Sequence, residues 1–267
     1  MTHPSLRRFS LAVLVALTST GCLRSTTTID LKPDGSGTIV QETAVSAQAL
    51  GMLQGLAGAN QAAGEKPPQL FGEEQARKAA TTMNVTFVSG EPIKTGDLEG
   101  YRARYAFDDI SKVTVKMDQG ANDIAPGADT KKPPFGFTFT RGAAASQLTI
   151  QMPDQTPGGT GALQFPGAGG GTDADKAQAA QAMAMMKMMM RGLYVDVTLN
   201  VNGRILKSNA PYVDGSRVTL MQIDFDKLLA DDEALQKLQN AKDIKSLAAV
   251  PGLKVITEPK VTIDFSR

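Results

Sequence analysis

Alternating apolar and polar positions run through much of the chain and predict a protein built mainly from β-strands. Residues 25–31 and 38–45 are rich in β-branched side chains. The segment between them contains Asp34 and Gly35, residue types that favour tight turns, so we predict a β-hairpin. Asp214-Gly215 predicts a second hairpin, which leads into a strand at 217–225.

The same alternation predicts further strands across the chain, and helical spacing predicts a few helices. The strands are expected at 85–89, 99–107, 113–117, 136–140, 147–152, 193–201, 204–208 and 254–265, the last with Pro259 indicating an edge position. Helices are expected after Ser46, which is a good N-cap residue, and near 73–83, 173–191 and 226–248. Residues 118–134 and 156–172 are rich in Gly, Pro, Ala and Asp, and we expect exposed, mobile loops there.

The first 21 residues have the organisation of a secretory signal peptide. Arg7 and Arg8 precede an apolar run at 9–17, which is shorter than the about 20 residues that a transmembrane helix needs. Small residues follow and lead to Gly21-Cys22, a junction that resembles the lipobox cut by lipoprotein signal peptidase. We predict that residues 1–21 are removed and that Cys22 is lipidated. The alternative is an ordinary signal peptide followed by a free thiol, a liability in an oxidising compartment.

Lipidation at Cys22 would anchor the chain to a membrane through acyl chains. Leu23 follows the cysteine in place of Asp, which resembles sorting to the outer membrane, facing the periplasm, in a cell with two membranes. In a cell with one membrane, we expect the outer face of that membrane. The chain without its signal peptide has a net charge near zero, so its overall charge does not suggest a nucleic-acid partner.

Residues 22–267 must fold around an apolar core, because a chain with one cysteine cannot form an internal disulfide. Their length is ample for one large domain or two small ones, and we expect one. The early hairpin TTTIDLKPDGSGTIVQETAVS and the later LYVDVTLNVNGRILKSNAPYVDGSRVTL, together with the lipidation cysteine, resemble LppM-type bacterial lipoproteins. The resemblance implies an α+β domain in which a curved antiparallel sheet with hairpins packs against helices and encloses an apolar ligand. It implies no enzyme.

The segment 181–191, QAMAMMKMMMR, stands out for its methionines. On a helical wheel, Lys187 and Arg191 form a basic strip, and most of the remaining circumference is apolar. We consider three interpretations: a helix packed on the sheet with Met as flexible filler, an adaptable surface for a lipid or partner protein, and a Met-only Cu(I) site. The residues of this candidate surface are Met183, Met185, Met186, Met189 and Met190.

The residue types argue against catalysis. His3 is the only histidine and leaves with the signal peptide, so the commonest general base near neutral pH is absent. Cys22 is acylated and provides no nucleophile. We therefore predict no catalytic residues, no cofactor and no metal site. The expected function is a non-catalytic envelope lipoprotein that binds an apolar or amphiphilic ligand. The alternatives are an interaction or assembly module for other envelope proteins and, third, an enzyme that uses Ser-Lys or paired-acid chemistry.

Overall fold

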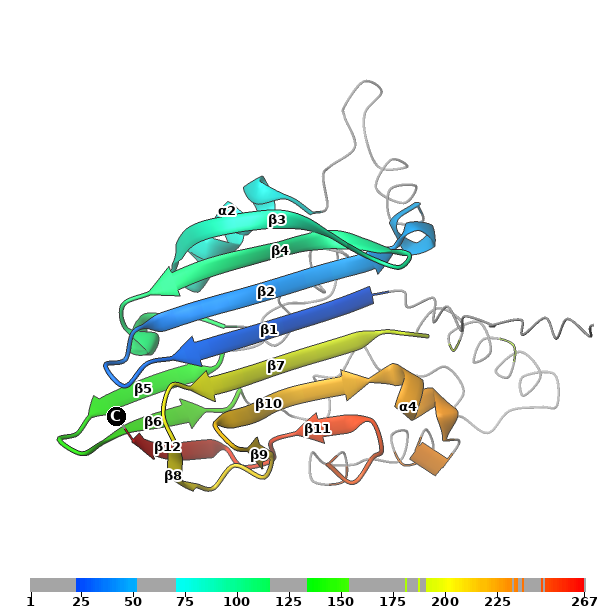
Figure 1. Cartoon of the computed structure of the whole chain (residues 1–267). Coiled ribbons are helices and arrows are strands. Elements are labelled where there is room, and N and C mark those ends of the chain that lie inside the picture. Colours follow the sequence, from blue (N-terminus) through cyan, green and yellow to red (C-terminus); the bar gives the residue numbers. More distant parts are fainter. Residues whose placement is uncertain are drawn as a thin grey trace, which may run out of the picture.

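The computed structural model describes residues 23–51, 71–115, 134–153, 191–231 and 248–266, together with residues 181, 187, 233, 234, 237 and 246. In this part of the chain β-strands predominate and helices are few (Figure 1). The strands form two sheets. The predicted signal peptide and most of the two predicted loops lie outside the described residues, so their predictions stay as they are.

The larger sheet contains eight described strands, in the order β11-β10-β7-β1-β2-β4-β3, with β9 paired to β10. Their bounds are β1 Leu23–Leu31, β2 Gly37–Ser46, β3 Thr86–Thr95, β4 Leu98–Phe107, β7 Tyr194–Val201, β9 Val213–Asp214, β10 Arg217–Asp224 and β11 Leu253–Val255. β1 pairs with β2 in antiparallel and with β7 in parallel orientation. The sheet is therefore mixed, and the prediction of an antiparallel sheet is wrong at the β1–β7 pair.

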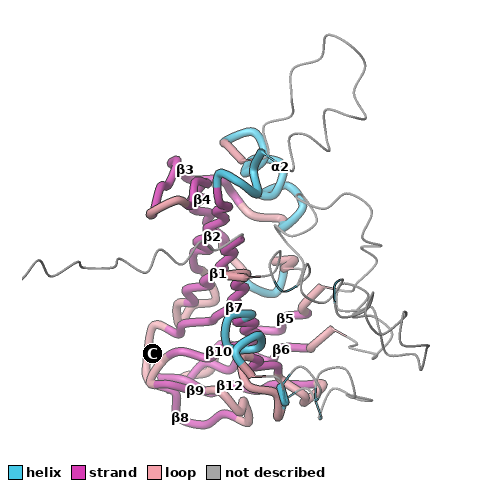
Figure 2. Tube along the Cα trace, turned by 90° about the vertical axis from the view of Figure 1, so that its right-hand side faces the viewer, coloured by secondary structure: helices cyan, strands magenta, loops and turns pink. Residues whose placement is uncertain are grey.

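The second sheet has four described strands in the order β5-β6-β12-β8. They are β5 Gly136–Arg141, β6 Ala145–Gln151, β8 Ile205–Ser208 and β12 Lys260–Ser266. After Asn202-Gly203 the chain leaves β7 in the large sheet and enters β8 in the second, because β8 pairs with β12. Strands β5 and β6 of the second sheet lie on the same side of the large sheet as helix α2 (Figure 2).

The described helical elements are α2 (Glu73–Met83), α4 (Phe225–Ala230) and the short 3-10 turn η1 (Ile110–Lys112). α2 buries Ala76, Ala80 and Met83, which recur at helical spacing, and ends at Asn84 in the left-handed conformation. Residues 47–51 begin another helical segment, in which the Ala49 N–H donates to Ser46 Oγ at 3.2 Å. This N-cap confirms the predicted helix start after Ser46.

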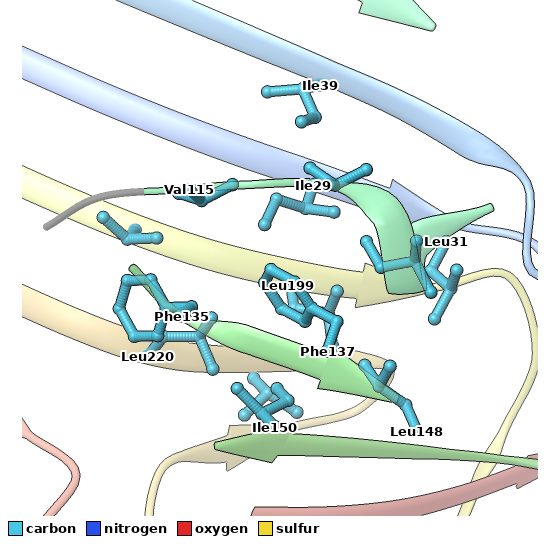
Figure 3. Close-up of a cluster of buried hydrophobic side chains, with 14 of the residues drawn as sticks. Ile29, Leu31, Ile39, Val115, Phe135, Phe137, Leu148, Ile150, Leu199 and Leu220 are labelled. Atoms are coloured by element: carbon cyan, nitrogen blue, oxygen red, sulfur yellow. The ribbon is translucent and has the colours of Figure 1, made fainter. Parts of the chain in front are cut away.

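The main core lies between the two sheets. Ile29, Leu31 and Leu199 of the large sheet are fully buried there, as are Leu148 and Ile150 of β6. Figure 3 shows the rings of Phe135 and Phe137 beside Leu199 and Leu220, between the strands of the two sheets. A smaller apolar cluster forms where α4 packs, around Phe225, Leu228, Ala234, Val250 and Leu253.

Both predicted Asp-Gly turns are confirmed. Gly35 and Gly215 have φ angles of 91° and 59°, in the left-handed region that glycine adopts without strain. The antiparallel pairs β1–β2 and β9–β10 follow from these turns.

Two strand predictions are wrong. The predicted strand 113–117 is reduced in its described part to an isolated bridge between Val115 and Phe135. The predicted strand 254–265 is divided into β11 and β12, which belong to different sheets. Pro259 lies in the connection between them and so does not mark an edge strand, and β12 has neighbours on both sides. Among the described residues, no helix is both long and apolar enough to cross a bilayer.

Candidate functional site

The two faces of the large sheet carry different chemistry. Side chains alternate between faces along a strand, so the residues that share a face with the core residues Ile29 and Leu31 can be read from the register. We call this face, which lies against the second sheet and α2, the inner face. The opposite face, towards the viewer in Figure 1, is the outer face.

The outer face is polar and its groups are bonded to one another. Arg102 joins Glu42 (Nε–Oε1 2.6 Å) and Glu91 (Nη1–Oε1 2.8 Å) across three strands. Asn200 Nδ2 donates to Asp30 Oδ1 at 2.9 Å. Further side-chain hydrogen bonds on this face join Thr28 to Thr198, Gln222 to Tyr194 and Arg217 to Asp196. The Arg24 guanidinium lies over the Tyr194 ring. Through these contacts the polar side chains of the outer face bond to one another, and their positive and negative charges largely balance.

Asp196 is the buried acid of the outer face, with a side chain 7% exposed and an oxygen 3.1 Å from Arg217 Nη2. Burial raises the pKa of the Asp196 carboxyl above its ordinary value, and the nearby positive charges of Arg217, Lys254 and Arg24 reduce this increase. The desolvation of the carboxylate therefore outweighs the ion pair.

The inner face contains a group of uncharged polar side chains that we call the inner polar cluster: Ser25, Thr27, Gln41 and Thr43. Ser25, Thr27 and Gln41 are buried, with exposed fractions of 3%, 5% and 8%, and Thr43 is half-buried. Thr27 pairs with Gln41 and Ser25 pairs with Thr43, so the four side chains form two adjacent rows on β1 and β2. The next row, Ile29 and Ile39, is fully buried and apolar.

The cluster differs from the outer face because most of its polar atoms have no hydrogen bond. Within the described part of the chain, no side-chain hydrogen bond is formed by Ser25, Thr27 or Thr43. Gln41 Oε1 accepts a long hydrogen bond from the Tyr105 hydroxyl at 3.5 Å, and the Gln41 amide nitrogen donates none there. Among the described residues, the buried side-chain atoms without any partner are Gln75 Oε1 and Glu258 Oε2, so the polar atoms of the cluster keep some contact with solvent. The cluster is therefore a set of polar groups that the fold does not pair and that water or a ligand can bond.

Apolar side chains continue the two rows of the cluster onto the next strands. Ser25 is beside Val195 and Thr27 is beside Val197 on β7, and Val195 is in turn paired with Ile223 on β10. Val195 and Ile223 are partly buried. Tyr101 of β4 lies on the other side of the cluster. Its ring covers Gly90 of β3, in the space that a Cβ there would fill, and so lies away from β1. The inner face thus changes from polar on β1 and β2 to apolar on β7 and β10.

The cluster can bind but carries no acid–base group of its own. Hydroxyls donate and accept hydrogen bonds and the free side of the Gln41 amide donates, whereas neither type titrates near neutral pH. Among the described residues, no group of three or more His, Cys, Asp or Glu side chains could hold a metal ion. Hydrogen bonding beside an apolar surface is the chemistry that this arrangement offers, and it suits an amphiphilic ligand.

The site residues predicted from the sequence do not include the inner polar cluster. Cys22 and the five residues of the Met surface, Met183, Met185, Met186, Met189 and Met190, all lie outside the described residues. The signal for the cluster was present, because stepping back by two from Leu31 and Ile29 reaches Thr27 and then Ser25. The β-propensity of the threonines does not by itself show which face of the sheet each one takes.

Comparison with known proteins gives one distant structural similarity. The chain matches no protein-family model and no curated protein. Among solved structures, it is similar to the folded domain of the Mycobacterium tuberculosis LppM protein, determined by NMR. The TM-score is 0.37 and the identity 10%, over 93% of this chain and 91% of that domain. The matched domain carries the name of the group of lipoproteins that the sequence resembles.

Proposed function

We propose that this chain is a membrane-anchored lipoprotein of the bacterial envelope that binds an amphiphilic ligand and catalyses no reaction. The observation that carries the ligand-binding part is the inner polar cluster. Its residues are largely buried, its hydroxyls and the Gln41 amide nitrogen have no hydrogen bond in the described part of the chain, and partly buried Val195 and Ile223 lie next to it. An amphiphile that occupied this region would satisfy both halves, because its head would bond the hydroxyls and its chain would cover the valine and isoleucine.

The anchoring part of the proposal comes from the sequence. The signal-peptide pattern and the Gly21-Cys22 junction support lipidation of Cys22, which places the chain on the outer membrane facing the periplasm, or on the outer face of the cell membrane in a cell with one membrane. Cys22→Ser should release the chain from the membrane fraction, because the acyl chains supply the membrane affinity. Labelling with a fatty-acid probe checks this directly, and continued labelling of the Ser variant would refute it.

A search for a bound lipid tests the ligand part. The chain with Cys22→Ser is purified from bacteria without detergent, and native mass spectrometry is used to look for a co-purified amphiphile. We expect an adduct whose occupancy falls in Thr27→Val and Gln41→Leu, which alter the cluster. Thr28→Val, on the opposite face of the same strand, is the matched control and should keep the adduct. Absence of any adduct, with no uptake of added lipid, would contradict the proposal.

A module for binding other envelope proteins is the second candidate, and the outer face favours it. No described helix or sheet packs over this face in Figure 2, and its polar groups form a continuous surface over several strands. Crosslinking in intact cells, followed by repetition with a charge reversal at Arg104, tests this alternative. Arg104 is exposed on that face and lies outside the inner polar cluster.

A further inference from the structure

We infer that the inner polar cluster selects amphiphiles with an uncharged head group that carries hydroxyl, ester or amide groups, and that Gln41 is the main determinant of this choice. The inference rests on the proposed function and names the class of ligand for the same site. A monoacylglycerol represents the class that should bind, and a lysophospholipid with an anionic head represents the class that should not.

The inner polar cluster has no charged neighbour on its own face of β1, β2 or β7. On β1, β2 and β7, the charged side chains nearest to it in sequence are Arg24, Glu42 and Asp196. By the register of the strands, all of these lie on the outer face. Burying an ionised head group without an opposite charge costs several kcal/mol. An anionic head would therefore meet this cost at the cluster, whereas a neutral head would not.

The nearest charges on the inner-face side of β4 and β3 strengthen the argument. Glu99 shares this face with Tyr101 and is 46% exposed, and Lys94 Nζ binds its Oε1 at 2.6 Å. This pair is near the rim of the sheet, and each charge already has its partner in the other. No free cation is therefore present among the described inner-face residues to compensate an anionic head.

The polar groups of the cluster have a particular number and position. Ser25 and Thr27 are two residues apart on one strand, about 7 Å along it. Gln41 stands directly across from Thr27 on β2. Because Gln41 Oε1 is used by the Tyr105 hydroxyl, the amide nitrogen is the group left to act, and it can only donate. A head with at least one acceptor for Gln41 and hydroxyls for Ser25 and Thr27 fits this pattern. A glycerol ester has these groups.

The apolar surface next to the cluster has a direction. From Ser25 the row continues through Val195 to Ile223, so an alkyl chain would run across the strands, away from β2. Two strand spacings cover about 10 Å. Along β1 the next row, Ile29 and Ile39, is apolar and fully buried, so it offers the head group no further hydrogen-bonding partner. The head and chain of one amphiphile thus have separate places on the inner face.

The test compares two lipids with the same acyl chain. Binding of 1-monooleoylglycerol and of oleoyl-lysophosphatidylglycerol is measured on the delipidated chain carrying Cys22→Ser, below the critical micelle concentration of each lipid. We expect the neutral lipid to bind at least tenfold more tightly. Gln41→Leu should weaken binding of the neutral lipid by about three- to tenfold, the effect of one hydrogen bond, and leave the affinity for the anionic lipid unchanged. Gln222→Leu, on the outer face, is the matched control and should change neither affinity.

The possible outcomes separate this inference from the proposed function. Equal or tighter binding of the anionic lipid would overturn the head-group inference and leave amphiphile binding intact. Binding of neither lipid would contradict both. Unchanged neutral-lipid affinity in Gln41→Leu, with a native far-UV spectrum, would overturn the role of Gln41.

Discussion

Replacing Thr27 with Val should make the ligand-free protein more stable. Thr27 is 5% exposed, and its hydroxyl has no hydrogen bond within the described part of the chain. Valine has nearly the same shape and suits a strand equally well, so packing is kept while an unsatisfied hydroxyl is replaced by a methyl group. Most core substitutions lower stability, so a gain here is specific to a polar group that the fold leaves without a partner.

The expected gain follows from the cost of the buried hydroxyl. Mutational data put a fully enclosed, unsatisfied polar group at about 1–3 kcal/mol, and the Thr27 hydroxyl keeps some contact with water, so we expect a gain of up to about 1 kcal/mol. For a chain of this size, each kcal/mol shifts the melting temperature by roughly 2–4 °C. The midpoint of thermal unfolding should therefore rise by up to about 4 °C. Urea unfolding should show a higher midpoint with an unchanged m-value.

The matched control is Thr28→Val on the other face of the same strand. The Thr28 hydroxyl is 3.4 Å from Thr198 Oγ1, so valine removes a contact there and should be neutral or cost up to about 1 kcal/mol. Both variants are compared on delipidated chains with Cys22→Ser, since a bound ligand would stabilise the unsubstituted chain by mass action. A loss of stability in Thr27→Val equal to or larger than that in Thr28→Val would refute the reasoning, because it would mean that the Thr27 hydroxyl is already hydrogen-bonded.

Three further predictions follow. Leu199→Ala, at a fully buried position between the sheets, should lower the free energy of unfolding by about 2–5 kcal/mol, and a cost under 1 kcal/mol in urea unfolding would contradict the packing in Figure 3. Burial raises the pKa of Asp196 in the folded protein above its ordinary 3.8, so the folded protein binds this proton more tightly than the unfolded chain does. The contribution of Asp196 to the free energy of unfolding therefore falls as pH rises from about 3.8 through the raised pKa. Asp196→Asn should remove this pH dependence of stability. If the melting temperature of Asp196→Asn rises relative to that of the unsubstituted chain as pH falls, the predicted direction is wrong. Replacing Met185 and Met189 with Gln should lower the melting temperature if the methionines pack on the sheet, but leave it nearly unchanged and weaken lipid or partner capture if they form a binding surface. A variant that loses only a response to Cu(I) would support the Met-only copper site.

The sequence allowed the local features of the fold to be predicted, because local chemistry determines them. Asp34-Gly35 and Asp214-Gly215 adopt tight turns whatever surrounds them, and Ser46 caps the helical turn that follows it. Strand pairing between distant segments has no such local signal. Nothing in residues 25–31 or 193–201 indicates that β1 and β7 lie side by side in parallel, so the mixed sheet was missed.

The boundaries of the last strands also depended on tertiary structure. Residues 254–265 are apolar enough to appear as one strand, yet Leu253–Val255 completes the large sheet and Lys260–Ser266 the second one. The inner polar cluster could not be predicted from the sequence for another reason. Alternation shows which residues share a face, but the burial of that face becomes known only when both layers are in place, and without burial Ser25 and Thr27 are ordinary strand residues.

The position of β1 between β2 and β7 has a consequence for the order in which the chain can fold. β2 follows β1 after a short turn, whereas the contact between Thr28 and Thr198 joins residues 170 positions apart. Pairings at such a separation form slowly because a long loop must be closed first. In a chain that emerges with its N-terminus first, the β1 edge of the β1–β2 hairpin stays unpaired until residues 194–201 are available. An unpaired edge is a template for aggregation, so the growing chain is most prone to aggregate during this interval.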